Sequence, residues 1–270
     1  MRAVCALGAV AGLWMSVSHG DKQPAMAEPW PDVPVGLTAP KPPPARTTEG
    51  LAREVETCLG LGRAAVEAGA LTAALPILRR AVALAPKNPV AWTLLGRVLT
   101  REGRQLEEAK KALERAALLA PEDAEPAYRL GLVFEQLGHP ERALKQYGMA
   151  AAHAPKRADV RLALGRCART AGKDTVARSA FEALRLLEPQ SAIARTNLAE
   201  LYERGADWKH AEEMLRALTK ESPGEWLYFE QLARFLERRG RQSEADDAFD
   251  VVRKLNPQRE TPARKYRPLR

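Results

Sequence analysis

The stretch 124–157 places apolar and small residues at helical spacing on both sides of a short break. Leu130, Gly131 and Phe134 fall on one face of a first helix, because residues three and four apart share a helical face. A second helix carries its inner stripe at i, i+4 and i+7, on Ala143, Tyr147 and Ala150. The pattern predicts two amphipathic helices packed as a hairpin.

The breaks in this stretch are marked by glycine and proline. Gly138 and His139 separate the two predicted helices, and Pro140 opens the second, where a fixed φ and a missing N–H cost least. Pro155 ends the unit, because proline cannot continue a helix. The unit is therefore 34 residues long, with Ala124 at its first position and Pro155 close to its last.

The same unit recurs along most of the chain. The terminating prolines are spaced by 35, 34, 34, 34 and 34 residues and are Pro86, Pro121, Pro155, Pro189, Pro223 and Pro257. The seventh position reads Leu61, Leu95, Leu130, Leu164, Leu198, Leu232. The eighth reads Gly62, Gly96, Gly131, Gly165, Ala199, Ala233, and the twentieth reads Ala74, Ala109, Ala143, Ala177, Ala211, Ala245. A fourth column holds Leu78, Leu113, Tyr147, Phe181, Leu215, Phe249. Six tandem units are predicted.

Small residues at positions eight and twenty let two helices approach closely, and the larger residues fill the remaining space at the density of a protein interior. Replacing Gly131 with Leu is expected to overpack the pair, at a cost of roughly 1–3 kcal/mol. The extra residue of the second unit is expected around Gln105–Glu107, between its helices. The fifth unit is the least regular, since Gly205 stands one place early.

The pattern resembles the tetratricopeptide repeat (TPR), a 34-residue helix–turn–helix unit with large, Leu-Gly, aromatic, Ala and Pro residues at set positions. The resemblance implies an all-α fold, a right-handed α-solenoid of six TPR units covering residues 54–257. It also implies that the first helices line a concave face, with ligand contacts at positions two, five, nine, twelve and thirteen. The Lys and Asn residues of chaperone-tail clamps are replaced here by Leu59, Arg63 and Leu94, so that function is not expected.

Both ends of the chain differ in composition from the repeats. Ala3–Val17 is an apolar run of fifteen residues after Arg2, which predicts a signal peptide or an N-terminal anchor over residues 1–20. Eight prolines make residues 21–53 a spacer, with Thr47 or Thr48 as candidate N-cap of a first helix that begins slightly before the array. The predicted tail, 258–270, holds five of the basic residues against one acidic residue. The net charge of +8 therefore does not by itself indicate a nucleic-acid-binding domain. The last helix is expected to turn Asp246, Asp247, Asp250 and Arg253 away from the core.

Few residues suggest chemistry. Cys58 and Cys167 lie three units apart, too far for a disulfide, and are expected to be buried free thiols. The four histidines show no metal-ligand spacing, and no phosphate-binding loop or nucleophile elbow occurs. We therefore expect no catalytic residue, no bound metal, no cofactor and no small-molecule substrate, and hence not an enzyme.

Binding is the remaining function. Arginine recurs at positions nine and twelve or thirteen, where it would form a basic stripe able to hold carboxylates in bidentate fashion. The candidate groove residues are Arg63, Arg97, Arg101, Tyr128, Arg166, Arg169, Arg204, Arg234 and Arg238.

The sequence predicts a non-catalytic scaffold for protein–protein interaction, exported to the periplasm or envelope of a bacterium, which binds a protein or peptide with an acidic segment. Membrane contact is expected only through the N-terminus, and a cytoplasmic location follows if residues 1–20 are not a signal. One alternative is a pilotin-like assembly factor for a secretin or pilus machine, although the lipid-attachment cysteine of such pilotins is missing. Another is a polyanion or nucleic-acid binder, which lacks the exposed aromatics that base stacking needs.

Overall fold

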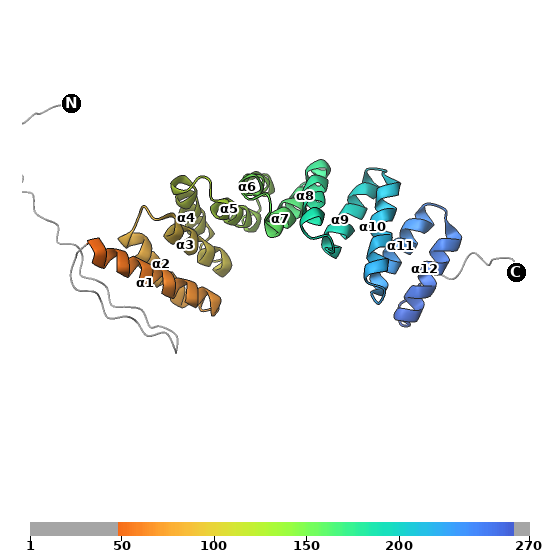
Figure 1. The fold of residues 1–270 in the computed structure, drawn as a ribbon, viewed down its shortest axis with the longest axis horizontal. Coiled ribbons are helices and arrows are strands. Elements are labelled where there is room, and N and C mark those ends of the chain that lie inside the picture. The colour runs from red at the N-terminus through yellow and green to blue at the C-terminus, as the bar shows by residue number, and fades with distance from the viewer. Residues whose placement is uncertain (1–47, 262–270) are drawn as a thin grey trace, which may run out of the picture. The chain divides into compact units, whose positions relative to one another are not determined.

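A computed structural model describes residues 48–261, which form twelve α-helices and no strand (Figure 1). The predicted signal segment, the spacer as far as residue 47 and the tail from residue 262 lie outside the described residues. The helices pair in chain order into six hairpins. They are α1 (Thr48–Glu67), α2 (Leu71–Leu84), α3 (Pro89–Glu102), α4 (Leu106–Leu119), α5 (Ala124–Gln136), α6 (Pro140–His153), α7 (Ala158–Thr170), α8 (Asp174–Leu187), α9 (Ala192–Arg204), α10 (Trp208–Glu221), α11 (Trp226–Arg238) and α12 (Gln242–Leu255).

Proline and the residue at position fifteen set the ends of these helices. Each second helix ends two residues before the proline of its unit, as α6 does at His153 before Pro155. Position fifteen takes a left-handed backbone in every hairpin turn, with φ between 57° and 75°. Glycine occupies it in five units, and Ala206 in the fifth, where Gly205 stands one place early. The extra residue of the second unit lies between Gly103 and Leu106, which confirms the prediction.

The core follows the four columns predicted from the sequence. All six alanines at position twenty are completely buried, and the large residues of the fourth column are at most 5% exposed. Each glycine at position eight lies directly against the large residue of its own hairpin. A Cβ on Gly131 would stand 2.4 Å from Tyr147 Cε1, and one on Gly96 would stand 2.4 Å from Leu113 Cγ. The predicted overpacking therefore has a defined steric cause.

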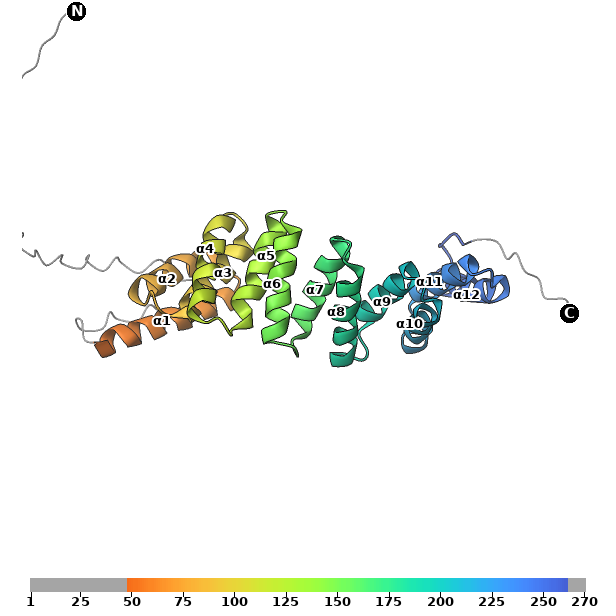
Figure 2. The same cartoon turned by 90° about the horizontal axis from the view of Figure 1, so that it is seen from above.

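Successive hairpins stack in chain order, since each second helix packs against the first helix of the next unit (Figures 1 and 2). The first helices of the first three hairpins also contact one another, α1 with α3 and α3 with α5. We call the surface lined by the odd-numbered helices the first-helix face. It corresponds to the face on which the resemblance placed ligand contacts.

Three details complete or correct the sequence-based picture. Helix α1 begins at Thr48 within the described residues, and Thr47, the other candidate N-cap, lies outside them. The prediction that Asp246 faces away from the core is wrong, because its side chain is 1% exposed and accepts a hydrogen bond from Gln242 Nε2 at 2.9 Å. Arg259, assigned to the tail, donates to Glu230 at 2.9 Å and lies over the Trp226 ring, as Arg157 does over Tyr128 three units earlier.

Cys58 and Cys167 are free and buried, as expected, and burial raises the pKa of each thiol to about 11. No helix within residues 48–261 is both long enough and apolar enough to span a bilayer.

Candidate functional site

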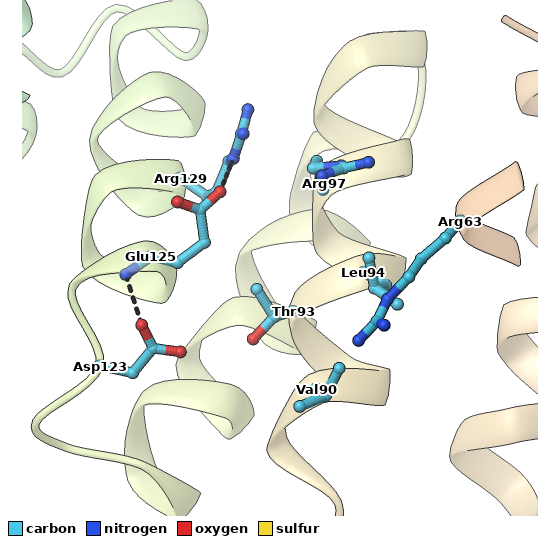
Figure 3. A pocket seen from close by; sticks show the side chains of 8 residues that line it. All are labelled: Arg63, Val90, Thr93, Leu94, Arg97, Asp123, Glu125 and Arg129. Carbon is cyan, nitrogen blue, oxygen red and sulfur yellow. Dashed lines mark hydrogen bonds and ion pairs between the residues drawn. The ribbon is translucent and has the colours of Figure 1, made fainter. Parts of the chain in front are cut away.

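A cleft of about 460 Å³ opens on the first-helix face between α1, α3 and α5 (Figure 3). Its lining comes from three consecutive hairpins and consists of Arg63, Val90, Thr93, Leu94, Arg97, Asp123, Glu125 and Arg129. Two of the nine residues proposed from the sequence, Arg63 and Arg97, therefore lie in one concave site. Both occupy position nine of their units.

Arg63 and Arg97 make no hydrogen bond or ion pair with any residue that the structure describes. Arg63 extends from α1 toward Val90 and Leu94 of α3 (Figure 3). Arg97 is half-buried, and burial lowers its pKa, because a charged guanidinium loses hydration there. The positive charge of nearby Arg129 lowers the pKa further, and Glu125 opposes that effect. An anion bound beside Arg97 would raise this pKa again, because an opposite charge stabilises the charged guanidinium group.

The α5 wall of the cleft holds charges that are already satisfied. The Asp123 side chain caps α5 by accepting from the Glu125 N–H at 2.9 Å. Glu125 accepts from Arg129 at 2.6 Å and from Arg157 at 2.7 Å. Burial raises the pKa of Glu125, but the two guanidinium groups outweigh it, so the net shift is downward. This wall is preorganised by its own ion pairs, and the unpaired cations are those of α1 and α3.

Aliphatic surface completes the cleft. Val90 is 41% exposed, and Leu94, one turn further along α3, is buried beside the Arg63 side chain (Figure 3). The Thr93 hydroxyl donates its hydrogen to the Pro89 carbonyl at 2.8 Å, so it has no hydrogen left to donate to a bound carboxylate. The cleft thus offers two unpaired guanidinium groups beside an apolar surface. Within residues 48–261 no group of three metal-ligating side chains occurs.

Four of the remaining groove candidates are paired with carboxylates of their own chain. Arg169 contacts Glu200 at 3.2 Å and Arg204 contacts Asp174 at 3.2 Å. The other two pairs are Arg234 with Glu230 and Arg238 with Glu203, both at 2.7 Å. These ion pairs neutralise the predicted basic stripe at four positions, on α7, α9 and α11.

The other three candidates differ from one another. Arg101 donates to the Val66 carbonyl at 3.4 Å, across from α3 to the end of α1. Arg166 is exposed, and its guanidinium has no partner among residues 48–261. Tyr128 is half-buried beneath Arg129 and Arg157, which lie 5.3 and 5.0 Å from its ring centre. Of the nine candidates, only Arg63, Arg97 and Arg166 have a guanidinium group without a partner among residues 48–261.

Sequence reasoning did not find the α5 wall. Glu125 stands at position two, one of the contact positions that the resemblance implied. A charged residue at that position was therefore the sequence signal that could have located this wall. Asp123 and Arg129 lie outside those positions. Their place in the cleft follows from the stacking of the second and third hairpins.

Comparisons with known proteins agree with this architecture. One tetratricopeptide repeat model matches residues 65–130, and another matches residues 128–192 and 175–225. No curated protein matches the chain.

Several solved structures are similar. YrrB, described as a TPR protein with an unusual peptide-binding site, is 23% identical with a TM-score of 0.55, covering 66% of this chain and 95% of YrrB. Pseudomonas aeruginosa pilF is 17% identical with a TM-score of 0.59, covering 78% of this chain and 95% of pilF. A tetratricopeptide repeat protein from Parabacteroides merdae is 21% identical with a TM-score of 0.57, covering 75% of this chain and 80% of the other. At these identities the likeness shows the fold.

Proposed function

Because the chain belongs to the tetratricopeptide repeat family, we propose that it is a non-catalytic scaffold that binds a segment of a partner protein on its first-helix face. TPR domains generally bind protein or peptide partners and generally lack catalytic activity. The partner segment places an acidic side chain in the cleft between α1, α3 and α5.

The observation that carries this proposal is the pair of unpaired guanidinium groups in the cleft. Arg63 and Arg97 form no ion pair with a carboxylate of the described residues. Arg234 and Arg238, at the other end of the array, each form one. A guanidinium group presents several N–H donors in a fixed plane that suits a carboxylate. The half-buried state of Arg97 strengthens the attraction, because a lower local dielectric screens charge less.

Binding by a stacked array is favoured by preorganisation. The hairpins hold the cleft residues before the partner arrives, so the ordering cost falls on the partner segment alone. An acidic segment is also steered toward the cleft by long-range attraction. The rate of association should therefore fall as salt is added.

The test is capture of the partner from the native envelope fraction by the full chain, followed by measurement of Kd for the partner identified. Arg63→Glu/Arg97→Glu reverses the cleft charge. Lys111→Glu/Arg115→Glu makes the same charge change on the exposed side of α4 and is the matched control. The proposal predicts at least tenfold weaker binding for the cleft variant and unchanged binding for the control. Equal recovery by the native chain and the cleft variant would refute it.

We further propose export to the periplasm or cell envelope, on the basis of the apolar run Ala3–Val17, which lies outside the described residues. The measurement is the mass of the mature N-terminal peptide from native cells. A peptide starting after residue 15 supports a cleaved signal. A peptide that starts at Met1 from a chain found in the cytoplasm contradicts export.

Two alternatives are outcomes of the same capture experiment. A pilotin-like role requires recovery of a secretin or pilus subunit, and likeness to pilF at 17% identity supports only the shared fold. A polyanion binder requires retention of nucleic acid at low salt with a steep loss as salt rises. The internal pairing of four groove arginines counts against it, because those groups are already neutralised.

A further inference from the structure

One carboxylate of the cleft is hydrogen-bonded but forms no ion pair within residues 48–261. Asp123, which caps α5, is exposed, and its Oδ1 atom accepts from the Glu125 N–H at 2.9 Å. Figure 3 shows its other oxygen turned toward Thr93. A helix N-terminus carries the equivalent of about half a positive charge, so it offsets only part of the negative charge of this carboxylate. Asp123 therefore presents a net negative charge to the cleft.

The charges without an ion-pair partner lie on different walls of the cleft. Arg63 and Arg97 come from α1 and α3, whereas Asp123 is the residue before α5. Figure 3 draws Thr93 and Val90 between Asp123 and Arg63. The cleft thus has a positive wall and a negative wall, separated by side chains of α3.

A purely acidic segment matches only the positive wall. A carboxylate beside Arg63 and Arg97 is attracted, but a second carboxylate beside Asp123 is repelled, because like charges raise the energy of the complex. A basic side chain at Asp123 replaces this repulsion by attraction. The two remaining charged lining residues, Glu125 and Arg129, already pair with each other at 2.6 Å.

We propose that the cleft recognises a short segment in which an acidic residue and a basic residue lie close together. The acidic side chain lies at Arg63 and Arg97, and the basic side chain lies at Asp123. This inference rests on the proposed function and names the class of segment that the same cleft binds. Asp123 is then a specificity-determining residue, because its charge selects against purely acidic segments and other polyanions.

The size of the cleft limits the distance between the two residues of the segment. A cube of about 460 Å³ has an edge of about 8 Å, which corresponds to roughly two to three residues of extended chain at about 3.3 Å per residue. The acidic and basic residues are therefore expected within about three positions of one another.

The charge of Asp123 can be removed without removing its helix cap. Asparagine caps helices about as well as aspartate, so Asp123→Asn should keep the hydrogen bond from the Glu125 N–H. Asp207 caps α10 in the same way, by accepting from the His210 N–H at 3.3 Å, and it does not line the cleft. Asp207→Asn is therefore the matched control.

The test is selection of short random peptides displayed on phage against the immobilised full chain. Four proteins are compared: the native chain, Asp123→Asn, the control Asp207→Asn and the cleft variant Arg63→Glu/Arg97→Glu. Thermal melts establish that each variant is folded. Kd is then measured for a peptide selected on the native chain and for the same peptide with its basic residue replaced by glutamine.

The proposal predicts that native selection enriches an acidic residue with a basic residue within about three positions. The Asp123→Asn variant should lose only the basic preference, while the control selects as the native chain does. The glutamine peptide should bind the native chain about two- to fivefold more weakly, in the range of exposed ion pairs, and bind Asp123→Asn as well as the original peptide does. A merely structural effect of Asp123→Asn would weaken both peptides equally and would overturn the inference.

A basic preference that survives in the Asp123→Asn variant overturns this inference and leaves the proposed function standing. Enrichment of purely acidic peptides by the native chain has the same consequence. Native selection that yields no enriched peptide, or the same peptides on the cleft variant, overturns the proposed function together with the inference.

Discussion

At the scale of single residues, the space beside Gly131 is already filled by the Tyr147 ring. A Cβ there would lie 2.4 Å from Cε1, closer than non-bonded carbons approach, and the ring is completely buried. The hydroxyl of Tyr147 donates to Glu135 at 2.6 Å, which limits how far the ring can shift. The close approach of α5 and α6 therefore depends on glycine at this position.

Gly131→Ala should destabilise the array by roughly 1–3 kcal/mol, because the added methyl group overpacks the hairpin. Gly148→Ala is the matched control, since Gly148 lies in α6 with nothing within 4 Å of its Cβ position. Alanine should stabilise that helix by up to about 1 kcal/mol. Urea unfolding followed by circular dichroism distinguishes the two. Equal stability of the Gly131 variant and the native chain would refute this packing.

Ala206 has a φ of 57°, in a region that costs an L-residue roughly 1–2 kcal/mol. Ala206→Gly should remove that cost. Because glycine loses more conformational entropy on folding than alanine, the net increase in the free energy of unfolding should be about 0.5–1 kcal/mol. The reverse change, Gly172→Ala, places alanine at the same turn position with φ near 67° and should destabilise. Thermal melts measure both, and a lower midpoint for Ala206→Gly contradicts the assigned backbone.

At the scale of helices, the sequence predicted boundaries well and side-chain pairing poorly. Proline and glycine act within a few residues, so Pro155 and Gly138 mark the limits of α6 and its turn without knowledge of distant contacts. Ion pairs such as Arg238 with Glu203 join residues 35 positions apart on different hairpins. They depend on the stacking angle between units, which the repeat pattern does not specify. The neutralised half of the basic stripe was therefore not predictable.

The ion pairs between hairpins should make the array less stable in acid. Arg129 and Arg157 hold the pKa of Glu125 below its ordinary value, although burial alone would raise it. A carboxyl group whose pKa is lower in the folded state stabilises the fold at pH values above its unfolded pKa, near 4.5. This contribution is lost as the pH falls through the pKa of the folded state. Glu212, Glu230 and Glu244 show the same direction.

The free energy of unfolding should therefore decrease as pH is lowered from about 5 toward 2. Glu125→Gln should cost roughly 0.5–1 kcal/mol at pH 7 and make this decrease shallower. Glu56→Gln removes an exposed carboxylate of α1 for which no ion pair occurs within residues 48–261, and it serves as control. Urea unfolding at several pH values gives the slopes. A Glu125 variant with the full native pH dependence would contradict the assigned pairs.

At the scale of the whole array, the repeat columns predicted six stacked hairpins, and the resemblance to the tetratricopeptide repeat implied a binding face on the first helices. Arg63 and Arg97 were identified because they share position nine, and the cleft brings them together. The same rule also selected Arg234, which Glu230 neutralises. The position of a residue in the repeat determines on which face its side chain lies. Whether that side chain is free to bind a partner depends on the charged residues of neighbouring units.

A partner is expected to lie on the first-helix face. The most direct measurement is photocrosslinking of the captured partner with p-benzoylphenylalanine in place of Val90, inside the cleft, or in place of Leu118, on a second helix. We expect a crosslinked partner from the Val90 position and none from the more exposed Leu118 position. A crosslink at Leu118 with none at Val90 would place the partner on the opposite side and contradict the account.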